Sequence, residues 1–191
     1  MNATQREPTA EELVAQLGNH ELREDAYKAL VALGESARSA VVAGLKHGQW
    51  EVRRWCALFL DHFADPAALQ ALKPLLHDPK SSVRLFAVHS LACDQCKPGE
   101  NPVDVVPLLI ERIQEDESIR VRRHAVLMLA HQHAYAELEG FFQELVDTES
   151  DRKLHKHAGI GLVFSRLASK RGNGLPFTGK DWVQLSRETS K

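Results

Sequence analysis

The chain has 191 residues, of which 43% are hydrophobic and 26% charged, a composition typical of one globular domain with a sizeable core. The formal net charge of -2 argues against a basic surface for nonspecific nucleic-acid binding. No apolar run approaches the roughly 18 residues that cross a bilayer, and an odd number of cysteines, 3, argues against a disulfide framework. These features predict a cytoplasmic protein with no membrane partner.

A capping box at 9–12, Thr-Ala-Glu-Glu, predicts the start of a first helix. A motif then recurs along the chain: an aliphatic residue, usually a base, two variable positions, a small residue, three variable positions and Leu. Its five copies begin at Leu22, Val52, Val83, Val121 and Leu154, in steps of 30, 31, 38 and 33 residues. The long step contains a Pro/Gly-rich insertion at 93–102. This period of about 30 residues predicts a repeat protein.

The aliphatic residue, the small residue and the Leu of each motif, which we call anchors, have the spacing i, i+4, i+8. This spacing places them on one face of a helix. A second amphipathic segment precedes the motif helices, for example at 67–76 and 103–113, and no segment alternates with period two. We therefore predict an all-α fold of about five helical hairpins, in one domain over 1–191. The predicted repeats are 9–33, 35–63, 66–94, 103–132 and 134–169. A glycine-rich break at 171–174 precedes an apolar segment at 175–188, which we predict to cap the last repeat.

The recurring Val-Arg-x-x-Ala-x-x-x-Leu pattern resembles the HEAT repeat family, including the subgroup related to phycobilin lyases, over about 10–168. The resemblance implies a right-handed α-α superhelix. It also implies an Asp–Arg ladder between repeats, with Asp six residues before the motif Arg. Asp78 and Arg84 fit this pattern, as do Asp116 and Arg122, whereas His47 stands at the Asp position of the second repeat. Arg84 and Arg122 are therefore expected to be structural.

A stripe of residues opposite the anchors is the candidate functional surface. Positions two, six and nine residues after the first anchor fall on that side of the helix at 100° per residue, and the resemblance implies that they face the concave surface. At position nine the stripe includes Val31, Asp61, Ala92, Ala130 and Val163. The alternative is that neighbouring helices bury the stripe. The predicted partner-binding residues are Arg54, Leu58, Leu85, His89, Arg123, Leu127, Lys156 and Ile160.

Aliphatic side chains edged by cations suit a peptide with apolar anchors and acidic flanks. The predicted function is a non-catalytic scaffold, monomeric or a weak dimer, that binds a protein or peptide. One alternative is phosphate or nucleic-acid binding at the helix starts of the last two repeats, although many carboxylates surround these cations. Another is a lyase-like or chaperone-like holder of an apolar ligand. The candidate anion-binding residues are Arg120, Arg123, His124, Lys153 and His157.

Three potential metal ligands follow one another as His89-x-x-x-Cys93-x-x-Cys96. A structural zinc site needs four ligands, and His62 or His131 is a candidate for the fourth. A redox-active pair and two ordinary cysteines at a helix end are the alternatives, and we expect no cofactor. An enzyme is not predicted: a di-iron hydroxylase in the family uses recurrent His-Glu pairs, and here only His20-Glu21 occurs. No Gly-x-Ser-x-Gly or phosphate-loop motif occurs either.

Overall fold

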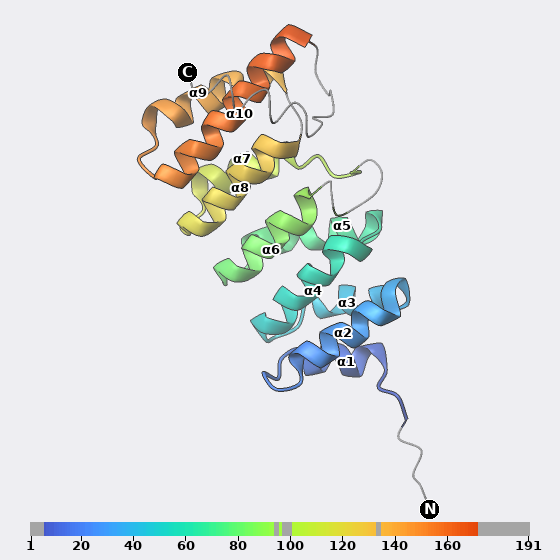
Figure 1. Cartoon of the computed structure of the whole chain (residues 1–191). Helices are drawn as coiled ribbons and strands as arrows, with labels where there is room; N and C mark the ends of the chain where they lie inside the picture. The colour runs from blue at the N-terminus through green and yellow to red at the C-terminus, as the bar shows by residue number, and fades with distance from the viewer. Residues whose placement is uncertain (1–5, 94–95, 97–100, 133–134, 172–191) are drawn as a thin grey trace, which may run out of the picture. The chain divides into compact units, whose positions relative to one another are not determined.

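A computed structural model describes residues 6–93, 96, 101–132 and 135–171, without the side chains at 131, 132 and 171. Throughout these residues the regular elements are helices and no strand occurs (Figure 1). The predicted all-α class of helical repeats is therefore confirmed. The predicted capping segment at 175–188 lies outside the described residues.

The structure contains two compact units, Met1–Val105 and Val106–Lys191. In the first unit, three hairpins follow one another along the chain, and α2 packs against α4 and α4 against α6. Each hairpin falls within one predicted repeat. The hairpins are α1 (Ala10–Gln16) with α2 (Arg23–Leu33), α3 (Arg38–Gly44) with α4 (Trp50–Phe63), and α5 (Pro66–Leu72) with α6 (Ser81–Ala92). Short 3-10 turns, Gly34–Ala37 and Lys73–His77, precede α3 and follow α5.

The second unit contains two hairpins, whose longer helices α8 and α10 pack against each other. The first is α7 (Val106–Glu115) with α8 (Ile119–Gln132), and the second is α9 (Glu139–Thr148) with α10 (Arg152–Arg171), preceded by the 3-10 turn Ala136–Leu138. None of the helices described in either unit has the length and apolar character needed to cross a membrane.

Side-chain caps and special backbone positions set the ends of several helices. Thr9 and Glu12 form the predicted capping box at the start of α1. Asp65 accepts a hydrogen bond from the backbone of Ala68, and proline follows it at the first position of α5. Gly34 ends α2 with a φ of 57°, which glycine adopts without strain.

The anchor positions form the core, as the motif spacing predicts. At the small-residue position, Ala26, Cys56, Ala87, Ala125 and Ala158 are each at most 2% exposed. The Leu that ends each motif is also buried. Burial of these two positions on every second helix explains how short helices with few aromatic residues reach close packing.

The first anchor of the first repeat is an exception, and its predicted burial is wrong. Leu22 is 45% exposed, whereas Val52, Val83, Val121 and Leu154 are 0% exposed. Leu22 is the N-cap residue of α2, while the other four stand at the third position of their helices. Because α2 begins three residues later in the motif than the other helices, Leu22 does not lie on its packed face.

Candidate functional site

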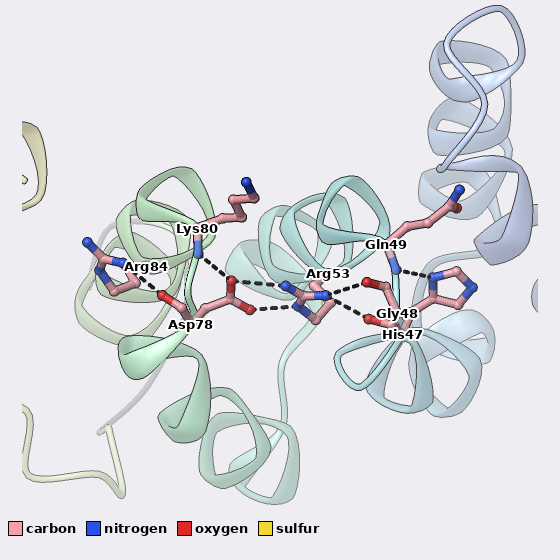
Figure 2. Close-up of polar contacts among 7 residues, drawn as sticks. All are labelled: His47, Gly48, Gln49, Arg53, Asp78, Lys80 and Arg84. Carbon is pink, nitrogen blue, oxygen red and sulfur yellow. Dashed lines mark hydrogen bonds and ion pairs between the residues drawn. The ribbon is translucent and has the colours of Figure 1, made fainter.

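The ladder between the second and third hairpins centres on Asp78 and Arg53 (Figure 2). Arg53 Nε donates to Asp78 Oδ2 over 2.6 Å, and Arg53 Nη2 donates to Asp78 Oδ1 over 3.0 Å. The Arg53 side chain is 14% exposed and that of Asp78 is 5% exposed. A bidentate pair with this much burial joins the loop before α6 to helix α4.

Asp78 also organises its own loop. Its Oδ1 accepts a hydrogen bond from Lys80 N at 2.8 Å, and its backbone carbonyl accepts one from Arg84 Nη1 at 2.8 Å. The carboxylate therefore pairs with the Arg of the preceding repeat, and the Arg of its own repeat binds the carbonyl (Figure 2). Arg84 is 5% exposed, in agreement with the expected structural role.

The side chain six residues before each motif base has the same local role in four loops. In each case it accepts a hydrogen bond from the backbone N–H two residues later, an Asx-like turn. His47 Nδ1 accepts from Gln49, Asp78 from Lys80, Asp116 from Ser118 and Glu149 from Asp151, over 3.1, 2.8, 2.8 and 2.9 Å. His47 thus keeps the turn but brings no carboxylate. The preceding Arg23 donates instead to the carbonyls of Leu17 and Gly18, over 2.8 and 3.4 Å.

In the second unit the ion pair joins Arg123, one residue after the motif Arg, to Asp151, two residues after Glu149. Arg122 Nη1 donates to the Asp116 carbonyl over 3.3 Å, and Arg123 Nε donates to Asp151 Oδ1 over 2.8 Å. Asp151 Oδ1 also accepts from Leu154 N at the start of α10. The Arg123 guanidinium, followed by this cap, holds the pKa of Asp151 well below its ordinary value. Arg123, a predicted partner-binding residue, therefore has an internal carboxylate partner.

The Arg123–Asp151 pair is expected to make stability depend on pH. Because the folded-state pKa of Asp151 is lowered, its contribution is complete above the unfolded value of about 3.9 and is lost as the pH falls through the folded value. Asp151→Asn keeps an N-cap acceptor and removes the charge. Thermal unfolding from pH 7 to pH 2 should therefore show the variant less stable at pH 7, with the difference shrinking below about pH 5. A difference that does not change with pH, or one equally large for the exposed Asp147→Asn, would contradict the assignment.

On the predicted partner surface of the first unit, Arg54, Leu58, Leu85 and His89 are half-buried. The Arg54 guanidinium carbon lies 4.8 Å from the ring centroid of Phe86 and 5.5 Å from that of Trp55. Arg54 is thus held against aromatic faces of α4 and α6.

In the second unit, Leu127 and Ile160 are half-buried and Lys156 is exposed. Ile160 packs against the cluster of Phe164 and Ala168 within α10. The aliphatic positions of the stripe are therefore half-accessible on α8 and α10, and Lys156 adds a solvated cation beside them.

At position nine of the stripe, the expected exposure is wrong for three of the five repeats. Asp61, Ala92 and Ala130 are 3%, 0% and 2% exposed. The burial alternative therefore holds for these three residues. Val31 on α2 is 39% exposed and Val163 on α10 is half-buried, so position nine stays accessible in the first and last repeats.

The candidate anion-binding residues have mixed environments. Arg120 and Lys153 are exposed, and His124 and His157 are half-buried. Burial, followed by the charges of Lys156 and Lys153, lowers the pKa of His157, so this imidazole is not a strong cation at neutral pH.

Four potential metal ligands come together at the C-terminal end of α4 and α6. One ligand atom from each of Asp61, His89, Cys93 and Cys96 lies within 4.8 Å of the others. The predicted fourth ligand was a histidine, and the structure instead brings in Asp61. His62 Nε2 lies 3.6 Å from Asp61 Oδ2 on an imidazole that is 58% exposed, and the side chain of His131 lies outside the described part. Sequence spacing did not identify Asp61 as a ligand, because its register is that of a position expected to face outward.

The Cys96 thiol of this cluster is a poor candidate for redox catalysis. Burial, followed by hydrogen bonds with Cys93 and Asp61, raises the pKa of Cys96 to about 12. Reactive cysteines have the opposite shift, because the thiolate is the nucleophile. Burial also raises the pKa of the core residue Cys56 to about 12.

Comparison with known proteins agrees with the helical architecture. Residues 10–92 match the model of the HEAT repeats family. A similar solved structure is the crystal structure of an engineered protein, with a TM-score of 0.54 and 21% sequence identity over 83% of this chain and 79% of that chain. No curated protein matches the sequence. The likeness to the engineered protein concerns the fold alone.

Proposed function

We propose, from the match of residues 10–92 to the HEAT repeats family, that the chain is a non-catalytic scaffold that binds a segment of another protein. The HEAT repeat fold generally mediates protein interactions and is typically non-catalytic. The single observation that carries the proposal is the set of half-accessible aliphatic residues on the second helices. In the first unit this surface consists of Leu58 on α4 and Leu85 on α6. In the second it consists of Leu127 on α8 and Ile160 on α10.

These residues are not needed as anchors of the repeat, since the opposite faces of the same helices form the core. A half-buried aliphatic side chain gains by further burial against a partner, at about 25 cal/mol per Å² of apolar area removed from water. The pairs lie on helices that pack against each other, α4 with α6 and α8 with α10. The proposed role of each pair is to contact apolar side chains of the bound segment.

Charge favours acidic residues in that segment. Lys156 is exposed on α10, one turn before Ile160. Arg54 lies one turn before Leu58 on α4, and its guanidinium lies over the ring of Phe86. A cation held by aromatic rings keeps its charge while losing little mobility on binding. We therefore propose a partner segment with aliphatic anchors flanked by Asp or Glu.

Substitution of the aliphatic positions tests the proposal in each unit. Leu58→Gln with Leu85→Gln should weaken binding to a purified partner at least about tenfold, since central contacts carry most of the binding energy. The matched control is Leu33→Gln, at a leucine that is 43% exposed on α2 and outside the surface. Affinity is measured by isothermal titration, and the melting temperature verifies folding. Equal affinities for wild type, the double variant and the control would refute the proposal that Leu58 and Leu85 contact the partner.

Charge variants separate this proposal from the anion-binding alternative. Charge reversal at Arg54 and Arg123 is unsuitable, because both have partners within the fold. Lys156→Glu should weaken binding of the acidic segment, whereas Lys153→Glu, at a neighbouring exposed lysine, should not. If Lys153→Glu weakened binding more than Lys156→Glu, and moderate salt abolished binding, a phosphate or nucleic-acid ligand would be favoured.

A further inference from the structure

The cluster of Asp61, His89, Cys93 and Cys96 contains a carboxylate, an imidazole and two thiols. All three groups are common ligands of zinc in proteins. Asp61 comes from α4, His89 from α6, and the two cysteines follow the end of α6. Zinc sites in proteins are built from Cys sulfur, His nitrogen and Asp or Glu oxygen, four of them in a structural site. Two sulfur ligands disfavour Mg²⁺ and Ca²⁺, which take oxygen ligands. We propose that these four residues form a structural Zn²⁺ site.

The distances within the cluster suit a tetrahedral ion. His89 Nε2 lies 3.3 Å from Asp61 Oδ2. Two such ligands with metal bonds of about 2.0–2.1 Å stand about 3.3–3.4 Å apart at the corners of a tetrahedron. The imidazole and the carboxylate are thus already positioned to share one ion.

The two sulfur atoms require a small adjustment. Cys93 Sγ and Cys96 Sγ are 2.9 Å apart, compared with about 3.8 Å for two thiolates with zinc bonds of about 2.3 Å. Both residues are half-buried and lie beyond the last turn of α6, so side-chain rotation can separate them by this amount. They are free thiols, and the 2.9 Å separation is well above the about 2.05 Å of a disulfide.

The local fold holds the ligand loop against the helix end. Cys93 N donates to the carbonyl of His89 over 2.8 Å, which attaches the first sulfur ligand to the last turn of α6. Asn101 Nδ2 donates to the carbonyl of Leu91 over 2.6 Å, and Asn101 Oδ1 accepts from Val103 N. The insertion that lengthens the third repeat thus returns to the C-terminal end of α6. A metal ion at this end would join α4, α6 and the insertion.

The burial of Asp61 gives the ion an electrostatic role. Its side chain is 4% exposed, and it faces the imidazoles of His62 and His89 and the thiol of Cys96. A buried carboxylate is costly without compensating charge. Binding of Zn²⁺ brings that charge, and each of the two thiols loses its proton to solvent as its sulfur bonds to the metal. The site has four protein ligands, which fits a structural rather than a catalytic ion.

Metal titration of the reduced full-length chain tests the proposal. Protein freed of metal by a chelator, with three reactive thiols per chain verified after denaturation, is titrated with Co²⁺ and then Zn²⁺. The expected result is one equivalent of Co²⁺ with the visible bands of tetrahedral coordination and a thiolate charge-transfer band. Zn²⁺ should displace Co²⁺ stoichiometrically and raise the melting temperature. A reduced chain that binds neither ion, or binds them without thiolate absorption, would overturn the site.

Ligand variants and matched controls identify the residues. Cys96→Ser, His89→Gln and Asp61→Asn should each lower Zn²⁺ affinity at least about tenfold, and Cys96→Ser changes a residue outside the helices. Cys56→Ala removes the third thiol and inserts the residue found at this position in the other four repeats, and His62→Gln removes the other imidazole beside Asp61. Both controls should bind Zn²⁺ like the wild type. Equal loss in the controls, or wild-type affinity in Cys96→Ser and Asp61→Asn, would overturn the assignment.

Discussion

Asp78→Ala is expected to lower the free energy of unfolding by about 3 kcal/mol, because it removes one partner of a buried ion pair. The bidentate contact with Arg53 is lost, and the guanidinium, 14% exposed, keeps its hydrogen bonds to the carbonyls of His47 and Gly48. The loop before α6 also loses the acceptor for Lys80 N. Urea unfolding followed by circular dichroism measures the change.

Two further variants separate the contributions at this position. Asp78→Asn retains an acceptor for Lys80 N and removes the charge that pairs with Arg53, so its loss should be smaller than that of alanine. Asp25→Ala breaks an exposed pair with Lys28, whose side chains are 87% and 72% exposed, and should cost less than about 0.5 kcal/mol. If Asp78→Ala lowered the free energy of unfolding no more than Asp25→Ala does, the Arg53–Asp78 pair would not contribute to stability.

The helices and their buried faces could be predicted from the sequence because both follow from local periodicity. The small residue and the Leu of each motif are four apart, and an α-helix places them on one face whatever the tertiary context. This spacing correctly predicted the burial of Ala87 and Leu91, for example. Leu22 fits the same spacing but precedes its helix, and a motif alone does not say where a helix starts.

The pairing of polar groups could not be predicted in the same way, since it depends on contacts between repeats. Arg123 and Asp151 are 28 residues apart, and no spacing rule selects this pair over Arg122 and Glu149. Likewise, Asp61 has the register of an outward position and is buried only because α6 packs beside α4. The Cys-x-x-Cys spacing indicated two metal ligands and His89 a third, but the carboxylate came from another hairpin.

Two glycines of α10, which the sequence does not distinguish, have different surroundings. A Cβ built on Gly161 would lie 2.4 Å from two ring carbons of Phe142, on the neighbouring helix α9, where ordinary contacts are 3.4–4 Å. A Cβ on Gly159 would meet nothing within 4 Å. Phe142 is 1% exposed and packed on all sides, so its ring has no free space into which to move.

Gly161→Ala is therefore expected to destabilise the second unit by about 1–3 kcal/mol through overpacking. Gly159→Ala, on the same helix, should stabilise it by up to about 1 kcal/mol, because alanine has the higher helix propensity and meets no neighbour. The opposite signs make the comparison independent of general effects of the substitution, and urea unfolding of both variants measures them. Pairing Gly161→Ala with Phe142→Leu should recover part of the loss if the ring is the obstacle, since contacting residues are coupled. Stabilisation by both alanine variants would mean that α9 and α10 are less closely packed than the contact between Gly161 and Phe142 requires.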